Sequence, residues 1–277
     1  MKIKKLLSGL KYLIKSDNKK LIESNLCGVK LLTINGTIRK KTDQDDAWFY
    51  YLAKHHEVIF DIGANIGYTA LLAMIQNPSR EYLLVDPNPL ALNDANKNLI
   101  SNNLGAKAYY FNSFISDTND YEVKFFTLGS GAAGSMFSSH AESASAVNSF
   151  INVTTKTLDF LYQFYNKKPD LVKIDVEGAE TLVMEGAYKL AENTKCTFFI
   201  EMHNEESIPM KMGGEKMIEW CKKADYKAWY LKTGEELIDS ETIAKRGKCH
   251  LLLLPKEKQY PKYLLGIEQN AQLPSNI

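Results

Sequence analysis

The sequence has no run of eighteen or more consecutive apolar residues in its 277 positions, so a membrane-spanning helix is not expected. Cysteine is scarce, and the four thiols are far apart with no C-x-x-C pair, which argues against a metal cage or a disulfide framework. Lys11 and Lys15 interrupt the apolar residues at the amino terminus, which is not typical of a secretory signal. We therefore expect a cytoplasmic protein with reduced cysteines packed as small hydrophobic residues: Cys27, Cys196, Cys221 and Cys249.

Net charge is also small, at +1, but it is unevenly distributed. The first 41 residues carry eleven Lys or Arg against two acids, a balance of about +9 that leaves about −8 for the rest. Within residues 1–20 the apolar side chains form one helical stripe with lysines around it, which predicts a basic amphipathic helix. Such a helix docks on its own protein or lies on an anionic membrane, here at the inner face, and we favour docking. The acidic remainder does not favour nucleic acid as an acceptor.

The order of the predicted elements defines the fold class. From Val58 onward, short apolar strands alternate with helix-like segments, which is typical of an α/β, doubly wound, mostly parallel sheet of the Rossmann-like kind. We expect a basic extension with helix and strand at 1–42, the α/β domain at 43–255 and a polar tail at 256–277. The seven expected strands are residues 58–62, 81–86, 107–114, 171–176, 197–203, 227–231 and 249–254.

Helices are expected at 68–76, 90–103, 179–191 and 215–223. Residues 121–128 alternate apolar and polar side chains, which predicts an inserted edge strand. Residues 129–149 are rich in Gly, Ser and Ala, which predicts a flexible loop that could act as a lid. His140 lies in this loop, and we do not expect it to contact an acceptor.

A glycine-spaced turn follows the first predicted strand. Its pattern, Asp61-x-Gly63-x-x-x-Gly67, lets the backbone approach a ligand and directs free helical N–H groups toward it. A pyrophosphate-binding turn would read G-x-G-x-x-G, with glycine where Asp61 stands. Because a carboxylate repels a diphosphate and attracts a cation, the turn favours S-adenosylmethionine, which carries a sulfonium and an ammonium. The alternative is a tight connector turn without a ligand.

A carboxylate also ends the second predicted strand. Asp86 follows a buried apolar run, and the Pro87-Asn88-Pro89 sequence stops the strand and opens a helix. It lies roughly twenty to twenty-five residues after the glycine turn, where a ribose diol needs an acceptor. A helix-capping or turn aspartate is the alternative interpretation.

Further titratable residues end the strands at 171–176 and 197–203. Glu201 and His203 lie two residues apart and so point to the same face, and Asp175 joins them if the two strands are neighbours. His203 has the most suitable unperturbed pKa for a general base, so we predict Asp175 and His203 as the catalytic pair, with Glu201 orienting them. The same three side chains could instead hold Mg²⁺, which we do not favour. Glu177 and Glu180 are at least as typical of acids at a helix start.

The sequence resembles the FkbM family of S-adenosylmethionine-dependent methyltransferases. The resemblance is carried by DIGANIGYTA at 61–70, DPNP at 86–89, TLD at 157–159, KIDVEGAE at 173–180 and the E-x-H of Glu201 and His203. It implies a class I methyltransferase fold, with Asp61, Gly63 and Gly67 at the methionine moiety, Asp86 at the ribose and Asp175 at the transferred methyl. The family usually has glutamate in place of Asp86, which is one methylene shorter, so that its ribose contact could need a water. Further cofactor contacts are expected from Asn65, Pro87, Asn88, Ser113 and Phe114.

The leading hypothesis is an S-adenosylmethionine-dependent methyltransferase that O-methylates a hydroxyl of a sugar, glycan or other small-molecule or lipid-linked acceptor. An NAD(P)-dependent oxidoreductase would share the strand order and the ribose carboxylate, but Asp61 and the lack of G-x-G-x-x-G disfavour it. A non-catalytic scaffold of glycan or lipid assembly would keep the fold without turnover.

Overall fold

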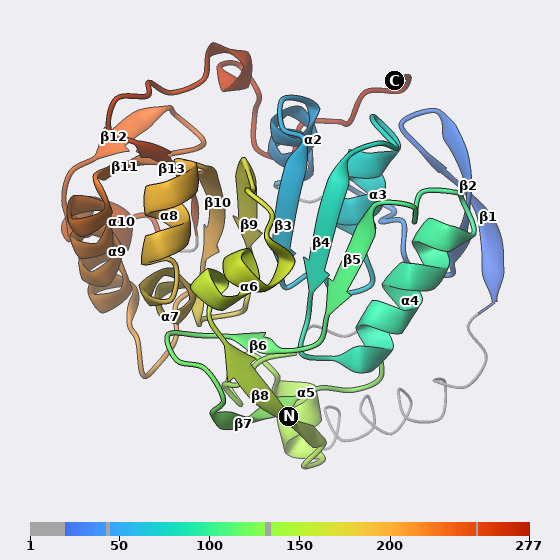
Figure 1. Cartoon of the computed structure of the whole chain (residues 1–277), viewed down its shortest axis with the longest axis horizontal. Helices are drawn as coiled ribbons and strands as arrows, with labels where there is room; N and C mark the ends of the chain where they lie inside the picture. Colours follow the sequence, from blue (N-terminus) through green and yellow to red (C-terminus); the bar gives the residue numbers. More distant parts are fainter. Residues whose placement is uncertain (1–19, 43–44, 131–133, 248) are drawn as a thin grey trace.

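The computed structural model describes residues 20–42, 45–130, 134–247 and 249–277, in which strands and helices alternate around one large sheet (Figure 1). The amphipathic helix predicted within residues 1–20 falls almost wholly outside the described residues, so its docking stays a prediction. In the part of the chain that is described, no helix combines the length and apolar character needed to cross a membrane.

The large sheet has eight strands in the order β12-β11-β13-β10-β9-β3-β4-β5. Five neighbouring strands, from β10 to β5, run parallel, while β13, β11 and β12 pair antiparallel. The predicted doubly wound, mostly parallel α/β class is confirmed, with one strand more than the seven expected, because the short polar segment of β12 gives little strand signal. The strands are β3 (Val58–Ile62), β4 (Glu81–Val85), β5 (Ala108–Phe111), β9 (Leu171–Ile174), β10 (Thr197–Met202), β11 (Tyr226–Tyr230), β12 (Glu235–Leu237) and β13 (Cys249–Pro255).

Helices cover both faces of this sheet, because successive residues of each strand point to opposite sides. Ile59 of β3 packs in the core that includes α2 (Asp46–Lys54), α3 (Tyr68–Met74) and α4 (Pro89–Ile100). Its neighbour Phe60 packs in the opposite core, which includes α6 (Leu158–Tyr165), α7 (Glu180–Glu185), α8 (Tyr188–Thr194) and α9 (Met210–Ala224). The helix predicted at 179–191 is therefore two helices, separated at Gly186, where a Cβ would come within 2.3 Å of the Ser116 carbonyl oxygen.

A smaller sheet of β6 (Phe114–Ile115), β8 (Phe150–Lys156) and β7 (Glu122–Phe126) lies below the parallel strands in Figure 1. The inserted edge strand predicted at 121–128 is present as β7, which pairs antiparallel with β8 at the edge of this smaller sheet. The single strand predicted at 107–114 is divided between the two sheets. Asn112 lies at the division, where its side-chain amide donates to the carbonyl oxygens of Asp86 and Pro87. The described part of 129–149 contains a short helix, α5 (Glu142–Ala146).

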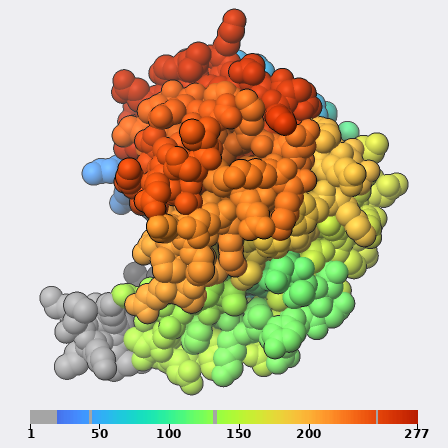
Figure 2. All heavy atoms as spheres, turned by 90° about the vertical axis from the view of Figure 1, so that its left-hand side faces the viewer, coloured from blue at the N-terminus to red at the C-terminus, as the bar shows by residue number. Residues whose placement is uncertain are grey.

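Both ends of the described chain pack on the domain. The hairpin of β1 (Leu21–Leu26) and β2 (Val29–Ile34) contacts α4, where Asn98 accepts the backbone N–H of Ile34. After β13, the tail forms the 3₁₀ turn η1 (Lys262–Leu264) and returns to α2, where Trp48 Nε1 donates to the Ile267 carbonyl oxygen at 2.9 Å. Figure 2 shows the face on the β12 side, which is covered by the last part of the chain, including α9 and α10 (Ser240–Ala244).

Candidate functional site

A cavity of about 240 Å³ lies where β3, β4 and β9 end. Ligands of doubly wound sheets bind at the carboxyl ends of the parallel strands, so its position agrees with the predicted site. A further wall comes from the segment between β2 and α2, which the sequence did not single out, through Gly36, Thr37 and Arg39.

Eight of the ten predicted cofactor residues line this cavity, whereas Asp61 and Gly67 do not. The eight are Gly63, Asn65, Asp86, Pro87, Asn88, Ser113, Phe114 and Asp175.

Asp61 is fully buried and bonded within the protein. Its Oδ2 accepts hydrogen bonds from the hydroxyls of Thr69, at 2.5 Å, and Tyr82, at 2.8 Å, while Oδ1 lies 3.4 Å from Nζ of Lys173. Because the Lys173 ammonium balances this carboxylate, the structure does not support the expected repulsion of a diphosphate by Asp61. Lys173 itself lines the cavity and was missed, although a lysine inside an otherwise apolar strand was a recognisable signal.

Gly67 begins α3 in the left-handed region, at φ 77°. A Cβ at this position would come within 2.8 Å of the Ala95 Cβ on α4, so Gly67 allows the two helices to pack closely. The contact with the methionine moiety that the resemblance implied for Gly67 stays a prediction.

Asp86 holds the two turns that border the cavity. Its Oδ2 accepts the backbone N–H of Asn65 and its Oδ1 accepts that of Asn88, each at 2.8 Å. Burial raises the pKa of Asp86 to about 6, against the opposing effect of these two hydrogen bonds. The carboxylate therefore fixes the backbone around the cavity as well as facing it.

The neighbouring polar side chains tie the cavity wall to the smaller sheet. Asn88 caps α4 by accepting the N–H of Leu90, and its amide donates to the Thr127 hydroxyl. The Ser113 hydroxyl donates to the Thr154 carbonyl oxygen at 2.6 Å. Asn65 differs, because its buried Oδ1 has no hydrogen-bond partner among the described residues.

Asp175, Glu177 and His203 meet at the end of β9, with one donor atom of each within 4.8 Å of the others. His203 Nε2 lies 3.4 Å from Glu177 Oε2, and its Nδ1 lies 2.8 Å from Glu180 Oε1. The structure thus brings Asp175 and His203 together as expected and adds Glu177, which the predicted site did not contain.

The pKa of His203 differs from the expectation of a near-neutral base. Burial alone would lower it, but the hydrogen bond to Glu180 and the charges of Glu180, Glu177 and Asp175 raise the pKa of His203 to about 9. Without a ligand the imidazole is therefore protonated at neutral pH.

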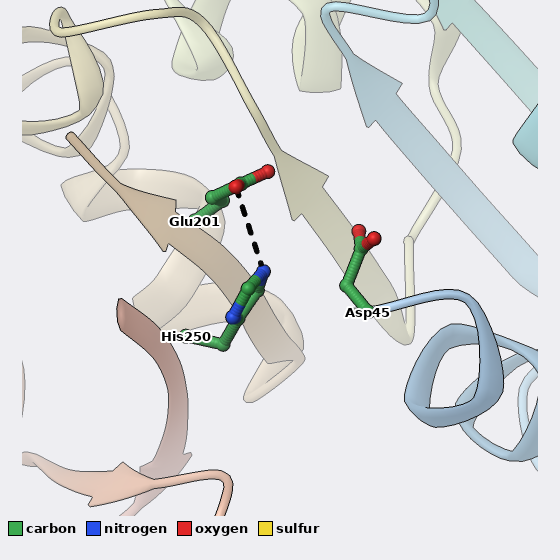
Figure 3. A group of neighbouring side chains, drawn as sticks. All are labelled: Asp45, Glu201 and His250. Carbon is green, nitrogen blue, oxygen red and sulfur yellow. Dashed lines mark ion pairs between the residues drawn. The ribbon is translucent and has the colours of Figure 1, made fainter. Parts of the chain in front are cut away.

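Glu201 lies between two imidazoles. Its Oε1 is 3.8 Å from His203 Nε2. The same oxygen is 3.7 Å from Nε2 of His250, its neighbour on β13 (Figure 3). Asp45, at the start of α2, completes a second buried group of possible metal donors with Glu201 and His250. The three residues considered for Mg²⁺ are thus divided between the two groups, with Asp175 and His203 in one and Glu201 in the other. We assign a metal to neither, because the Lys173 ammonium already lies beside these carboxylates.

His140 lies closer to this site than expected. Its Nε2 is 3.2 Å from Glu205 Oε2, its Nδ1 is 3.5 Å from Glu177 Oε2, and its ring meets that of His203 edge to face at 5.8 Å. The His140 ring therefore lies against the ring of His203.

The Asp45 carboxyl group is expected to make the protein less stable as pH rises. Burial raises its pKa from 3.8 to about 7, against the opposing charge of Lys173, so the folded state binds a proton that the unfolded state has lost. This contribution to stability is present below about pH 4 and is lost as pH rises through 7. Asp45→Asn removes this pH-dependent loss of folding stability. The loss is at most about 4 kcal/mol for a pKa that rises from 3.8 to about 7.

Urea unfolding at pH 4.5 and pH 8 measures this effect. The stability of Asp45→Asn relative to the parent protein should be higher at pH 8 than at pH 4.5, whereas the exposed control Asp225→Asn should show no such change. An identical pH dependence for Asp45→Asn and the parent protein contradicts the assignment.

Comparison with protein families matches residues 61–228, more than half of the chain, to the methyltransferase FkbM domain. No curated protein matches the chain.

Several solved structures are similar to this chain at low sequence identity. Methyltransferase FkbM from Methylobacillus flagellatus KT is 12% identical over 72% of this chain and 43% of that one, under half its length, with a TM-score of 0.45. TYW2 of M. jannaschii in complex with AdoMet is 12% identical over 85% of each chain, with a TM-score of 0.45. A methyltransferase from Geobacter sulfurreducens is 11% identical over 78% of this chain and 80% of that one, with a TM-score of 0.41. These values are too low to assign a substrate.

Proposed function

Because the chain belongs to the FkbM methyltransferase family, we propose that it transfers a methyl group from S-adenosylmethionine to a hydroxyl of a sugar, glycan or other small-molecule or lipid-linked acceptor. The observation that carries this proposal is the single cavity wall running from Asn65 and Asp86 to Asp175, beside which His203 lies. Such a wall can hold a cofactor at one end and an acceptor at the other.

The polar groups of the cavity fit the cofactor. Asn65 Oδ1 is a buried acceptor without a partner among the described residues, which suits the α-ammonium of a methionine moiety. Asp86 offers the ribose hydroxyls the lone pairs that its two backbone hydrogen bonds leave. Ser113 and Phe114, at the far wall, are the proposed neighbours of the adenine.

The cofactor supplies a methyl group on a positively charged sulfur. When the acceptor oxygen bonds to that methyl carbon, the S–CH₃ bond breaks and its electron pair stays on sulfur, which leaves S-adenosylhomocysteine. In this proposal Asp175 positions the acceptor and His203 Nε2 takes the hydroxyl proton, so Nε2 must be unprotonated at that moment. A nearby sulfonium favours this state, because a positive charge lowers the pKa of an imidazolium.

Asp86→Ala is expected to weaken S-adenosylhomocysteine binding by about 10- to 100-fold, the effect of losing one or two hydrogen bonds to a charged group. Calorimetric titration measures the affinity, with Asp117→Ala as an exposed carboxylate control that should bind like the parent protein. Equal affinity for Asp86→Ala and the control would remove Asp86 from the proposed site.

The function is tested by incubating the protein with S-adenosylmethionine labelled in the methyl group and with fractionated cell-wall, lipid and small-molecule extracts. The proposal predicts label in an acid-stable, base-stable product, as an ether has, with one S-adenosylhomocysteine released per methyl group. Label transferred to nitrogen corrects the acceptor class. Reduction of NAD or NADP with no methyl transfer supports the oxidoreductase, and no turnover in any fraction supports the scaffold.

A further inference from the structure

The carboxylate of Glu180, the first residue of α7, is held in place by two groups. Its Oε1 accepts the N–H of Gly178 at 3.0 Å and lies 2.8 Å from His203 Nδ1. Glu180 is 2% exposed and the His203 side chain 4%, so water does not compete for this contact. The sequence suggested a helix-start acid, but the side chain points to an imidazole on a different element.

The contact determines which nitrogen of the neutral imidazole carries the proton. A carboxylate can only accept, so Nδ1 of His203 must donate to Glu180. The remaining lone pair of the neutral ring is then on Nε2, which is buried and makes no hydrogen bond with the described residues. This is the atom that the methyl-transfer proposal needs as the proton acceptor.

We propose that Glu180 is a positioning residue that holds His203 in its Nδ1–H tautomer and directs Nε2 toward the acceptor hydroxyl. The inference rests on the proposed function, but it concerns a residue that the predicted site did not contain. It also links two family motifs, because Glu180 ends KIDVEGAE and His203 ends the E-x-H pair.

The other charged groups around His203 do not serve this role. Glu177 and Glu201 approach Nε2 at 3.4 and 3.8 Å, Asp175 contributes a charge from the end of β9, and His140 meets the ring edge to face. These groups influence the charge of the ring, whereas Glu180 alone among the described residues has a hydrogen bond to Nδ1. Orientation therefore depends on Glu180.

Nitrogen-15 NMR of histidine-labelled protein tests the tautomer directly. The chain has five histidines, so His203→Gln identifies the resonance by subtraction. In the parent protein above about pH 9, where the pKa of His203 leaves the ring neutral, Nδ1 should have the shift of a protonated nitrogen and Nε2 that of an unprotonated one. A proton on Nε2, or a mixture of both tautomers, overturns the proposal whether or not an acceptor is known.

Kinetics of Glu180→Gln provide the second test. Methyl transfer should fall about 10- to 100-fold in kcat, as is typical when the partner of a functional histidine is removed, with little change in the KM for S-adenosylmethionine. Glu185→Gln, an exposed change on the same helix, should behave like the parent protein. A Glu180→Gln variant with the kcat of the parent protein also overturns the proposal.

The two proposals fail in different ways. If the parent protein binds no S-adenosylhomocysteine and transfers no methyl group, the proposed function fails, while the tautomer of His203 can still be measured. If methyl transfer occurs while neutral His203 is in the Nε2–H form, only the positioning role of Glu180 fails. The same holds if Glu180→Gln transfers methyl groups at the rate of the parent protein.

Discussion

Gly63→Ala is expected to destabilise the protein by about 3 to 5 kcal/mol and to abolish cofactor binding. Gly63 has φ 87°, and a Cβ at this position would lie 1.9 Å from the carbonyl oxygen of Asp175. That oxygen belongs to the backbone of the neighbouring turn, so it cannot rotate away. To relieve the overlap, the turns after β3 and β9 must separate, and both form walls of the cavity.

Gly266→Ala is the matched control for backbone strain. Gly266 has nearly the same backbone angle, φ 84°, but a Cβ there would have no neighbour within 4 Å. Its substitution should cost only the strain of a left-handed alanine, about 1 to 2 kcal/mol, with normal binding. Urea unfolding and calorimetric titration with S-adenosylhomocysteine compare the two variants. Equal losses of stability and of binding in the two variants would show that the close approach of the two turns is not needed for the fold or for the cofactor site.

His203→Gln is expected to reduce kcat for methyl transfer by about 10²- to 10⁴-fold, the usual contribution of a general base. Glutamine is similar in polarity, but its amide cannot take a proton at neutral pH. S-adenosylhomocysteine affinity should stay within about threefold of the parent value, because His203 is assigned to the acceptor and not to the cofactor. The release of S-adenosylhomocysteine in the presence of an active extract measures the rate.

His55→Gln controls for the loss of a histidine as such, since His55 is exposed and stacks on Tyr263, away from the cavity. It should retain full activity. If the kcat of His203→Gln is within a few-fold of that of the parent protein and of His55→Gln, His203 is not the general base. Weaker cofactor binding with an unchanged kcat would instead move His203 to the cofactor end.

The strand pattern made much of the site predictable. Ligands bind where parallel strands end, so the residues following β3, β4 and β9 could be assigned to one cavity from periodicity alone. The parity of Glu201 and His203 likewise predicted that both point to one face, although His203 lies just beyond the end of β10. Both predictions used local sequence patterns only. They needed the order of the apolar strand segments and the identity of the residues at the end of each segment.

The contacts that could not be predicted join segments distant in sequence. Glu180 and His203 meet across 23 residues, and Asp45 and His250 approach Glu201 from opposite ends of the domain. Asp61 was assigned to the ligand because its place in the glycine motif can be read from the sequence, whereas its partner Lys173 cannot. Only the register of Asp61 opposite Lys173 reveals that this carboxylate is balanced internally.

The central claim is that the cavity at the ends of β3, β4 and β9 binds the methyl donor. Calorimetric titration of the parent protein with S-adenosylhomocysteine, NAD and NADP, repeated with Gly63→Ala, measures this most directly. The account predicts one S-adenosylhomocysteine per chain, no binding of either dinucleotide, and no binding by the variant. Binding of a dinucleotide in place of S-adenosylhomocysteine would contradict it.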